Sequence, residues 1–273
     1  MITAAASTGR RRSAVRRPPL VLLVPAALAA LFLLLPLLGL VQRAPWADLG
    51  AQLSTPEARA ALRLSLVCSL WATVLALGFG VPLAWVLARV EFPGRSFVRA
   101  LALLPLVLPP VVGGVALLEA FSRRGLVGEP LGDWLGVQLT FSTAGAVLAE
   151  TFVALPFVVI TVEAALRGMD RRVEDAAATL GAGRLTVLRR VTLPAVAPAL
   201  LGGAALAWAR ALGEFGATIT FAGNVEGRTR TVPLAVYLLL DTDPGTAIAL
   251  SLVMVAVCVA VLTLLRGRWL VGR

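Results

Sequence analysis

Residues 174–194, EDAAATLGAGRLTVLRRVTLP, form a polar segment with three arginines between two long apolar runs. Such a segment is unusual in a chain whose residues are 59% hydrophobic and only 15% charged. The flanking runs indicate a membrane protein, so the polar segment must lie outside the hydrocarbon or against other protein. The pattern of apolar runs and arginines around it sets the fold class and the side of the membrane.

Six apolar stretches are long enough to cross a bilayer as helices, since a hydrocarbon core about 30 Å thick requires about 20 residues. Four of them contain no charged residue: 20–41, 64–88, 100–118 and 246–265. The other two, near 142–166 and 195–222, contain four charged residues, Glu150, Glu163, Arg210 and Glu214. Those side chains should face protein or water and not lipid. The predicted fold class is therefore all-α, a polytopic membrane protein with six transmembrane helices.

The arginines are divided unequally between the two sets of loops. Seventeen lie in the N-terminal tail, in the links after the second and fourth spans and at the C-terminal end, against seven in the opposite loops. The positive-inside rule therefore predicts that both termini and the 174–194 segment are cytoplasmic. The ten-residue run TVPLAVYLLL, 231–240, is too short to cross and should form a short helix on the outer side or at the mouth of a pathway.

The predicted organisation has four parts. Residues 1–18 form a basic, disordered cytoplasmic tail attracted to anionic lipid, 19–42 the first transmembrane helix, 59–266 the main membrane domain, and 267–273 a cytoplasmic C-terminal end. A signal peptide or a twin-arginine signal is the alternative for the head of the chain. We favour an uncleaved span, because the apolar stretch exceeds a typical signal core and no small-residue cleavage site follows it.

The composition excludes several kinds of site. The chain contains no histidine, which rules out histidine-based catalysis and histidine-ligated zinc. Cys68 and Cys258 both lie in apolar runs, where a packing role is expected instead of a disulfide or a metal site. The formal charge of +10 comes from arginines beside apolar runs and not from one basic face, which argues against nucleic acid as a partner. No catalytic residue, metal ligand or cofactor of this chain is predicted.

A helix, a turn and a second helix are predicted from 170 to 194. Asp170 can cap a helix whose apolar residues follow the i, i+3, i+4, i+7 spacing of one face: Val173, Ala176, Ala177 and Leu180. Gly181 and Gly183 supply a helix end and a bend, and a short helix follows from Arg184 to about Val191. The pattern alone leaves two interpretations open, a solvated connector between two spans or a small-faced docking surface.

The same segment resembles the EAA loop in the permease subunits of ABC importers. The residues that carry the resemblance keep the spacing of that family: Asp175, Ala176, Ala177, Gly181, Val191, Leu193 and Pro194. Asp175 stands where the family usually has Glu, and Glu174 comes directly before it. The resemblance implies that the 170–194 loop docks on a separate cytoplasmic ATPase and couples its closure to the membrane spans.

The absence of lysine agrees with this implication independently. The phosphate-binding loop G-x-x-x-x-G-K-[ST] requires a lysine, and the chain contains none. If ATP drives transport, a partner subunit must hydrolyse it, and this chain is a transport subunit and not an enzyme.

Three further stretches resemble the molybdate permeases of the ABC importers, with the sulfate and tungstate permeases as close relatives. They are LPLVLPPVVGG at 104–114, RALGEFGATITFAGN at 210–224 and RTRTVPLAVY at 228–237. The resemblance implies a type I ABC importer permease fold in the cytoplasmic membrane of a prokaryote. It also implies a homodimer, two ABC ATPase subunits and an extracytoplasmic oxyanion-binding protein.

Six residues of two spans are candidates for the translocation path: Arg210, Gly213, Glu214, Gly216, Pro109 and Pro110. A tetrahedral dianion needs water, backbone dipoles or cations along its route, and Arg210 is the one base inside a predicted span. Arg210 and Glu214 lie one helical turn apart, so they can also simply neutralise each other between packed helices. The glycines suit close packing equally well, and prolines are common in membrane helices.

An ion-coupled secondary transporter of an anion is the alternative function. In that case an intramembrane carboxylate, Glu150, Glu163 or Glu214, would relay protons. A membrane-embedded enzyme has little support without histidine, clustered cysteines or a nucleophile motif. The contacts of the 170–194 loop distinguish the two transport hypotheses.

Overall fold

The computed structural model describes residues 20–269, and all regular secondary structure in that range is helical. The tail predicted at 1–18 lies outside the described residues, as do residues 270–273 of the predicted C-terminal end. The chain divides into two units, residues 1–43 and residues 44–273. Each unit is described by itself.

The described part of the first unit contains α1, Leu20–Gln42. Its 23 residues extend about 35 Å at about 1.5 Å per residue, which is enough to cross a bilayer. Leucine, alanine and valine on all sides make α1 apolar all round, as expected of a helix surrounded by hydrocarbon. The helix α1 coincides to within one residue with the stretch 20–41 predicted as the first span.

The described part of the second unit consists of long helices joined by short ones. The long helices are α3 (Pro56–Arg89), α7 (Thr143–Gly168), α10 (Leu193–Leu212) and α13 (Pro244–Trp269). The shorter helices are α2 (Leu49–Ser54), α4 (Arg95–Val107), α5 (Pro110–Phe121), α6 (Gly128–Leu135), α8 (Arg172–Thr179), α9 (Arg184–Val187), α11 (Gly216–Phe221) and α12 (Val232–Thr242). A π-helical turn, Leu188–Thr192, joins α9 to α10, so that Arg184–Leu212 is one helical path of 29 residues.

Small residues let α3, α7 and α10 pack closely. A Cβ atom on Gly80 of α3 would lie 3.0 Å from Val158 of α7, and a Cβ on Gly203 of α10 would collide with Thr161 of α7. Buried alanines and valines of the three helices form one apolar core. Because lipid supplies no hydrophobic drive between helices, close van der Waals packing of this kind holds the bundle together.

The third predicted span, 100–118, is not one straight helix. It is built from α4 and α5, whose axes differ in direction by 120°. Pro109 and Pro110 follow each other at the break, where proline can neither donate a backbone hydrogen bond nor let the preceding residue stay helical. Leu108 accordingly has extended backbone angles, φ −65° and ψ 134°. By length and composition, the described chain therefore holds five candidate spans, or six if this bent pair counts as one.

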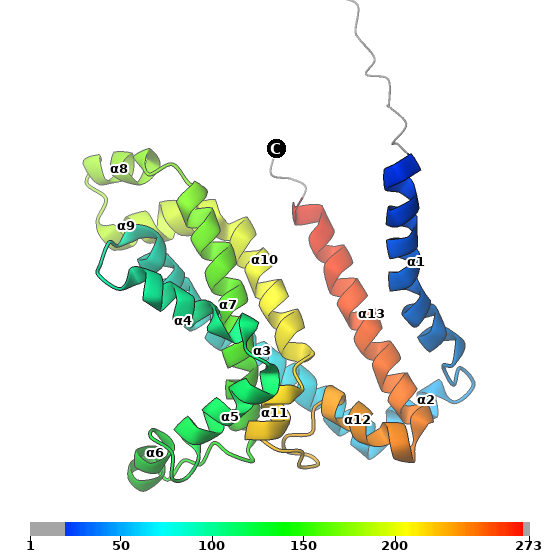
Figure 1. The fold of residues 1–273 in the computed structure, drawn as a ribbon. Helices are drawn as coiled ribbons and strands as arrows, with labels where there is room; N and C mark the ends of the chain where they lie inside the picture. Colours follow the sequence, from blue (N-terminus) through cyan, green and yellow to red (C-terminus); the bar gives the residue numbers. More distant parts are fainter. Residues whose placement is uncertain (1–19, 270–273) are drawn as a thin grey trace, which may run out of the picture. The chain divides into compact units, whose positions relative to one another are not determined.

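The fifth predicted span, 195–222, is also interrupted. The helix α10 ends at Leu212, and α11 begins only at Gly216. Glycine has a low helix propensity, and the Glu214 carboxylate accepts a hydrogen bond from the Ala217 N–H at 2.7 Å, which starts a new helix. The two broken spans meet, because α5 packs against α11 (Figure 1).

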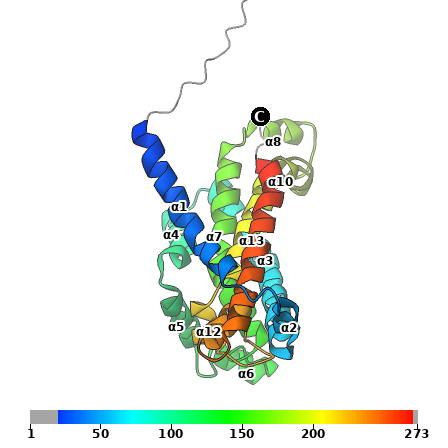
Figure 2. The same cartoon turned by 90° about the vertical axis from the view of Figure 1, so that its right-hand side faces the viewer.

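The second unit places its loops at two opposite ends of the long helices. The helix α8 and the C-terminal end of α13 lie at one end, and α2, α6 and α12 lie at the other (Figures 1 and 2). The 170–194 loop and the described end of α13 therefore lie at the same end of the helices. The helix α12 has 11 residues, about 16 Å, and is too short to cross, as predicted.

Candidate functional site: the 170–194 loop and the broken helices

The helix predicted in the 170–194 loop forms as α8. Asp170 Oδ1 accepts a hydrogen bond from the Arg172 backbone N–H at 3.0 Å, so Asp170 caps its start. Gly181 has a φ of +84°, a left-handed conformation that favours glycine, and its N–H donates to the Ala178 carbonyl. A helix of eight residues is not stable by itself in water, so these caps and the contacts below determine that it forms.

The helix α8 has two different faces. Val173, Ala176 and Leu180 are exposed on one face, where Val173 is 53% and Leu180 is 89% exposed. Residues of the other face, among them Glu174, Asp175 and Ala178, line a pocket between α8 and the bundle. Exposed apolar side chains in such a polar segment form a surface that another protein can cover.

Two adjacent carboxylates of α8 have different surroundings. Glu174 Oε2 lies 3.1 Å from a guanidinium nitrogen of Arg89, the last residue of α3. The Thr192 hydroxyl donates to Glu174 Oε1 at 2.7 Å. Asp175 is exposed and forms no ion pair with any residue between 20 and 269. Glu174 therefore attaches α8 to α3 and to the π-helical turn, and Asp175, at the position where the family usually has Glu, stays available to a partner.

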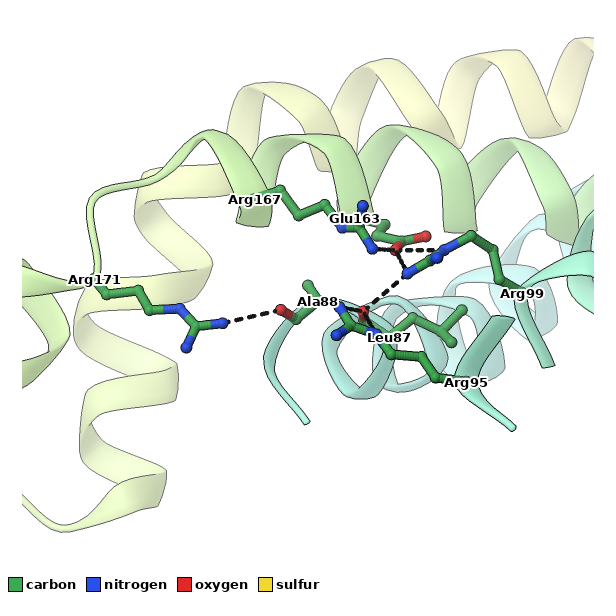
Figure 3. A network of polar contacts seen from close by, with 7 residues as sticks. All are labelled: Leu87, Ala88, Arg95, Arg99, Glu163, Arg167 and Arg171. Carbon is green, nitrogen blue, oxygen red and sulfur yellow. Dashed lines mark hydrogen bonds and ion pairs between the residues drawn. The ribbon is translucent and has the colours of Figure 1, made fainter. Parts of the chain in front are cut away.

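A network of arginines surrounds Glu163 near the end of α7 (Figure 3). Glu163 Oε1 accepts from Arg99 Nε at 2.9 Å and lies 2.8 Å from a guanidinium nitrogen of Arg167. Arg95 Nε donates to the Leu87 carbonyl at 2.8 Å, and Arg99 reaches the same carbonyl at 3.4 Å. Three arginines from α4 and α7 thus converge on one carboxylate and one backbone oxygen.

This network supplies hydrogen-bond donors to the last carbonyl groups of α3. The last carbonyls of a helix have no partner within it and carry partial negative charge, which nearby cations stabilise. Arg171, which directly precedes α8, donates to the Ala88 carbonyl at 3.2 Å (Figure 3). The end of α3 therefore joins α4, α7 and the 170–194 loop. Sequence reasoning missed this network, although arginines cluster at 89–99 and at 167–172, on either side of it.

The three carboxylates predicted to avoid lipid are buried. Glu150 and Glu214 are each 1% exposed, and Glu163 is 7% exposed. Glu163 and Glu214 form ion pairs with arginines, whereas Glu150 Oε2 has no hydrogen-bond partner among the residues that the structure describes. Of the three, only Glu150 has a fully buried oxygen without a hydrogen-bond partner in the described part of the chain.

The two charged candidates for the translocation path, Arg210 and Glu214, form an ion pair. A guanidinium nitrogen of Arg210 lies 2.5 Å from Glu214 Oε2, and the other oxygen of Glu214 holds the Ala217 N–H. The Arg210 side chain is 28% exposed, so its cation is not fully enclosed by this pair. Gly213, between them, follows the last residue of α10.

The structure also brings Pro110 and Gly216 together. A Cβ atom on Gly216 would lie 2.8 Å from Pro110 Cβ and 3.2 Å from the Val111 backbone nitrogen. Pro109 directly precedes α5, so the two prolines start the helix that meets α11. Two stretches of the sequence, LPPVVGG and GEFGATITF, thus form one close contact between broken helices. The glycine here is used for close packing.

No group of three histidine, cysteine, aspartate or glutamate side chains suited to a metal ion occurs within residues 20–269. Cys68 and Cys258 are both free thiols, and Cys68 is buried.

Comparison with known proteins identifies the family. Residues 80–269 match the family model described as binding-protein-dependent transport system inner membrane component. The molybdenum transport system permease protein ModB of Mycobacterium tuberculosis is 50% identical over 228 residues, which cover 84% of this chain and 86% of that protein. ModB of Escherichia coli K12 is 46% identical, covering 80% and 95%. The sulfate transport system permease protein CysT of Salmonella typhimurium is 39% identical, covering 80% and 81%.

Solved structures show the same fold. A bacterial ABC transporter that imports the acidic polysaccharide alginate has a chain with a TM-score of 0.71 at 20% identity, covering 91% of this chain and 92% of that one. A chain of the MetNI methionine ABC transporter, in an inward-facing conformation, has a TM-score of 0.54 at 18% identity, covering 87% and 99%. The chain therefore belongs to the family of binding-protein-dependent transport system inner membrane components, and it is a multi-pass ABC importer permease of the prokaryotic cytoplasmic membrane related to the molybdenum permeases.

Proposed function

We propose that this permease moves molybdate into the cell and is driven by a separate ATPase that docks on the exposed face of α8. The observation that carries the proposal is the pairing of an exposed apolar face, Val173, Ala176 and Leu180, with an internal anchor, Glu174, on the same short helix. A docking surface can transmit force only if it is attached to what it moves. The relatives at 46–50% identity that are named molybdenum permeases support the choice of oxyanion.

Movement of α8 has two routes into the bundle. One route is the contact of Glu174 and Arg171 with the end of α3. The other is the continuous helical path from Arg184 through the π-helical turn into α10. Both helices pack on α7, so a displacement of α8 by an ATPase would shift α3 and α10 together.

The broken helices α5 and α11 are the proposed gate of the pathway. Helix breaks inside a membrane are tolerated where they line a cavity or pack against protein, and they allow small local movements. Arg210 lies one turn before the second break and is only partly neutralised by Glu214, so it can attract a dianion. In this proposal Gly213, Pro109 and Pro110 supply the bends.

The complete transporter is proposed to contain two copies of this chain, two cytoplasmic ABC ATPase subunits and an extracytoplasmic oxyanion-binding protein. The five or six candidate spans of one chain are few for enclosing a pathway, so a second copy would complete it. The absence of lysine means that the phosphate-binding loop of the ATPase must come from a partner. This chain then binds no nucleotide cofactor of its own.

The proposal is tested with a charge placed on the docking face. Leu180→Asp, at a side chain that is 89% exposed, should reduce co-purification of the cognate ATPase and ATP-dependent molybdate uptake by vesicles. Thr179→Asp adds the same charge to the neighbouring exposed position of α8 and is the matched control. Equal ATPase binding by both variants would contradict docking through this face. Parallel uptake of labelled molybdate, tungstate and sulfate identifies the preferred oxyanion.

A second candidate function, ion-coupled transport, is favoured by one observation, the unpartnered and buried Glu150 Oε2. Such a carboxylate could carry a proton through the membrane. Uptake that continues without ATP and is lost in Glu150→Gln would support this candidate and reject the leading one.

A further inference from the structure

Two pockets adjoin each other behind α8, and they differ in chemistry. The first, of about 240 Å³, lies between α3, α7 and the start of α10. The second, of about 390 Å³, lies between α8 and the end of α3. Trp85, Leu188 and Thr192 line both, so the two pockets share a wall and adjoin.

The first pocket is an apolar groove. Its wall consists of valine, leucine, proline and tryptophan side chains, including Val86, Leu166 and Leu193, with one hydroxyl, that of Thr192. This hydroxyl is already used, since it donates to Glu174. Apart from the indole N–H of Trp85, the groove offers no free side-chain hydrogen-bonding group, so its fitting occupant is a hydrocarbon chain.

The second pocket is cationic. The Arg89 side chain is only 9% exposed, and its Nε has no hydrogen-bond partner among the described residues, although it lines this pocket. Arg184 lines the same pocket and forms no ion pair within residues 20–269. Glu174 is held by Thr192 and Arg89, whereas Asp175, which lines the same pocket, is exposed and has no ion-pair partner in the described chain. The pocket therefore contains three guanidinium groups, those of Arg89, Arg171 and Arg184, and two carboxylates, with a net positive charge. Arg89 is largely buried and Arg184 is exposed, and guanidinium groups with free donors suit a phosphate, whose oxygens accept several hydrogen bonds at once.

The two pockets follow each other along α3, from its apolar part to its C-terminal end. The helix α3 ends at Arg89, and α10 begins at Leu193, so the cationic pocket lies where the helices leave the apolar layer. Val81, at the far end of the groove, precedes Arg89 by eight residues, about 12 Å along α3. Trp85 lies between them, and tryptophan is enriched at the boundary between hydrocarbon and headgroups.

We propose that an anionic phospholipid occupies these adjoining pockets, with its phosphate against Arg89 and Arg184 and one acyl chain in the groove beside Trp85. A phospholipid matches the two pockets in chemistry and in order. Its acyl chain fits the apolar groove, and its phosphate fits the arginine-lined pocket at the helix ends. Basic pockets between transmembrane helices are a known way in which proteins hold lipid headgroups. The lipid would fill the space behind α8 and support the helix from the side opposite its exposed face.

The test uses the full-length chain in lipid nanodiscs. Phosphatidylglycerol with a brominated acyl chain should quench tryptophan fluorescence more strongly than brominated phosphatidylcholine, and Trp85→Phe should remove that difference. The chain has six tryptophans, so the variant isolates the contribution of this one. Quenching by the two lipids that is equal in the unmodified chain would overturn the proposal.

Charge-specific retention gives a second measurement. Arg184→Gln should lower the ratio of phosphatidylglycerol to phosphatidylcholine that co-purifies with the chain by about five-fold, the effect of one basic residue near a lipid surface. Arg190→Gln is the matched control, because Arg190 is exposed and does not line either pocket. Val86→Phe, which narrows the groove without changing charge, should also lower lipid retention. Equal ratios in Arg184→Gln and Arg190→Gln would overturn the site.

Other occupants give different outcomes. Free inorganic phosphate that displaces phosphatidylglycerol completely, with no effect of Val86→Phe, would show an anion site without a lipid and reject the proposal. If the brominated lipid quenches the isolated permease and the quenching disappears when the ATPase is added, the lipid site is supported and the lipid competes with the ATPase. The proposal does not depend on which oxyanion is transported, since all readouts concern the isolated permease.

Discussion

A guanidinium nitrogen of Arg89, at the end of α3, lies 3.1 Å from Glu174 of α8, while the next residue, Asp175, forms no ion pair within the described chain. The two neighbouring carboxylates therefore have different surroundings: Glu174 is paired inside the protein, and Asp175 is exposed and, among the described residues, unpaired at the pocket beside α8. Glu174 determines where the helix sits, because its second oxygen also accepts from Thr192. Residue spacing alone aligns Asp175, and not Glu174, with the position at which the family usually has glutamate.

Neutralising the two carboxylates should give different results. Glu174→Gln removes one half of a largely buried ion pair and leaves Arg89 without compensation, so we expect a loss of about 2 kcal/mol in stability. Asp175→Asn changes an exposed group and should stay within about 0.5 kcal/mol of the unmodified chain. Thermal unfolding in detergent measures both. A larger loss for Asp175→Asn would show that the assignment of the two roles is reversed.

Glu163 should be essential to the junction of α4 and α7. Glu163→Gln leaves Arg99 and Arg167 close together without an anion; because these side chains are 27% and 47% exposed, water screens part of the effect, and we expect a loss of about 1–2 kcal/mol in stability. Glu91→Gln, at an exposed position between α3 and α4, is the control and should be silent. In a double-mutant cycle, Arg99→Gln should cost much less in the Glu163→Gln background than alone. If the two substitutions had additive effects on the free energy of unfolding, the contact between Arg99 and Glu163 would contribute nothing to stability.

Gly216 should tolerate no side chain at the crossing of α5 and α11. In Gly216→Ala, the added methyl would lie 2.8 Å from Pro110 Cβ and against backbone, so the helices must separate at a cost of about 1–3 kcal/mol. Oxyanion uptake should fall, while ATPase binding at the distant α8 should be retained. Gly78→Ala places its methyl in open space on α3 and is the control. Normal uptake by Gly216→Ala would remove this crossing from the proposed gate.

Asp243 should contribute a pH-dependent cap to α13. Its pKa is lowered from the ordinary value of 3.8, first by the hydrogen bond from the Thr246 hydroxyl to Oδ2 at 2.6 Å and then by the Thr246 N–H bond to Oδ1 at 3.2 Å. A lowered pKa means that the stabilisation is complete above 3.8 and is lost as the pH falls through the lower value of the folded state. Asp243→Ala should therefore cost about 1 kcal/mol near neutral pH. Its difference in melting temperature from the unmodified chain should shrink in acid; a constant difference would contradict the cap.

Several features of this protein follow from the sequence by itself. The spans, the helix α8 and the short helix α12 depend on residues that are close along the chain: apolar runs of sufficient length, the Asp170 cap and the Gly181 turn. Hydrocarbon enforces backbone hydrogen bonding within each segment, so helix formation in a membrane is largely a local property. The resemblance at 170–194 had the same local character, because it rests on residue spacing.

The relationships between segments were decided only by the tertiary structure. Local composition indicates that proline and glycine weaken the helices of the third and fifth spans, but not that the direction of the third span changes by 120°. The partners of Glu163 could not be predicted either, since Arg99 lies 64 residues away and five other arginines occur from 89 to 172 on the same predicted side. The contact of Pro110 with Gly216, and the pockets behind α8, exist only because distant segments approach closely. Periodicity records which side of a helix is apolar, whereas packing in three dimensions determines what that side meets.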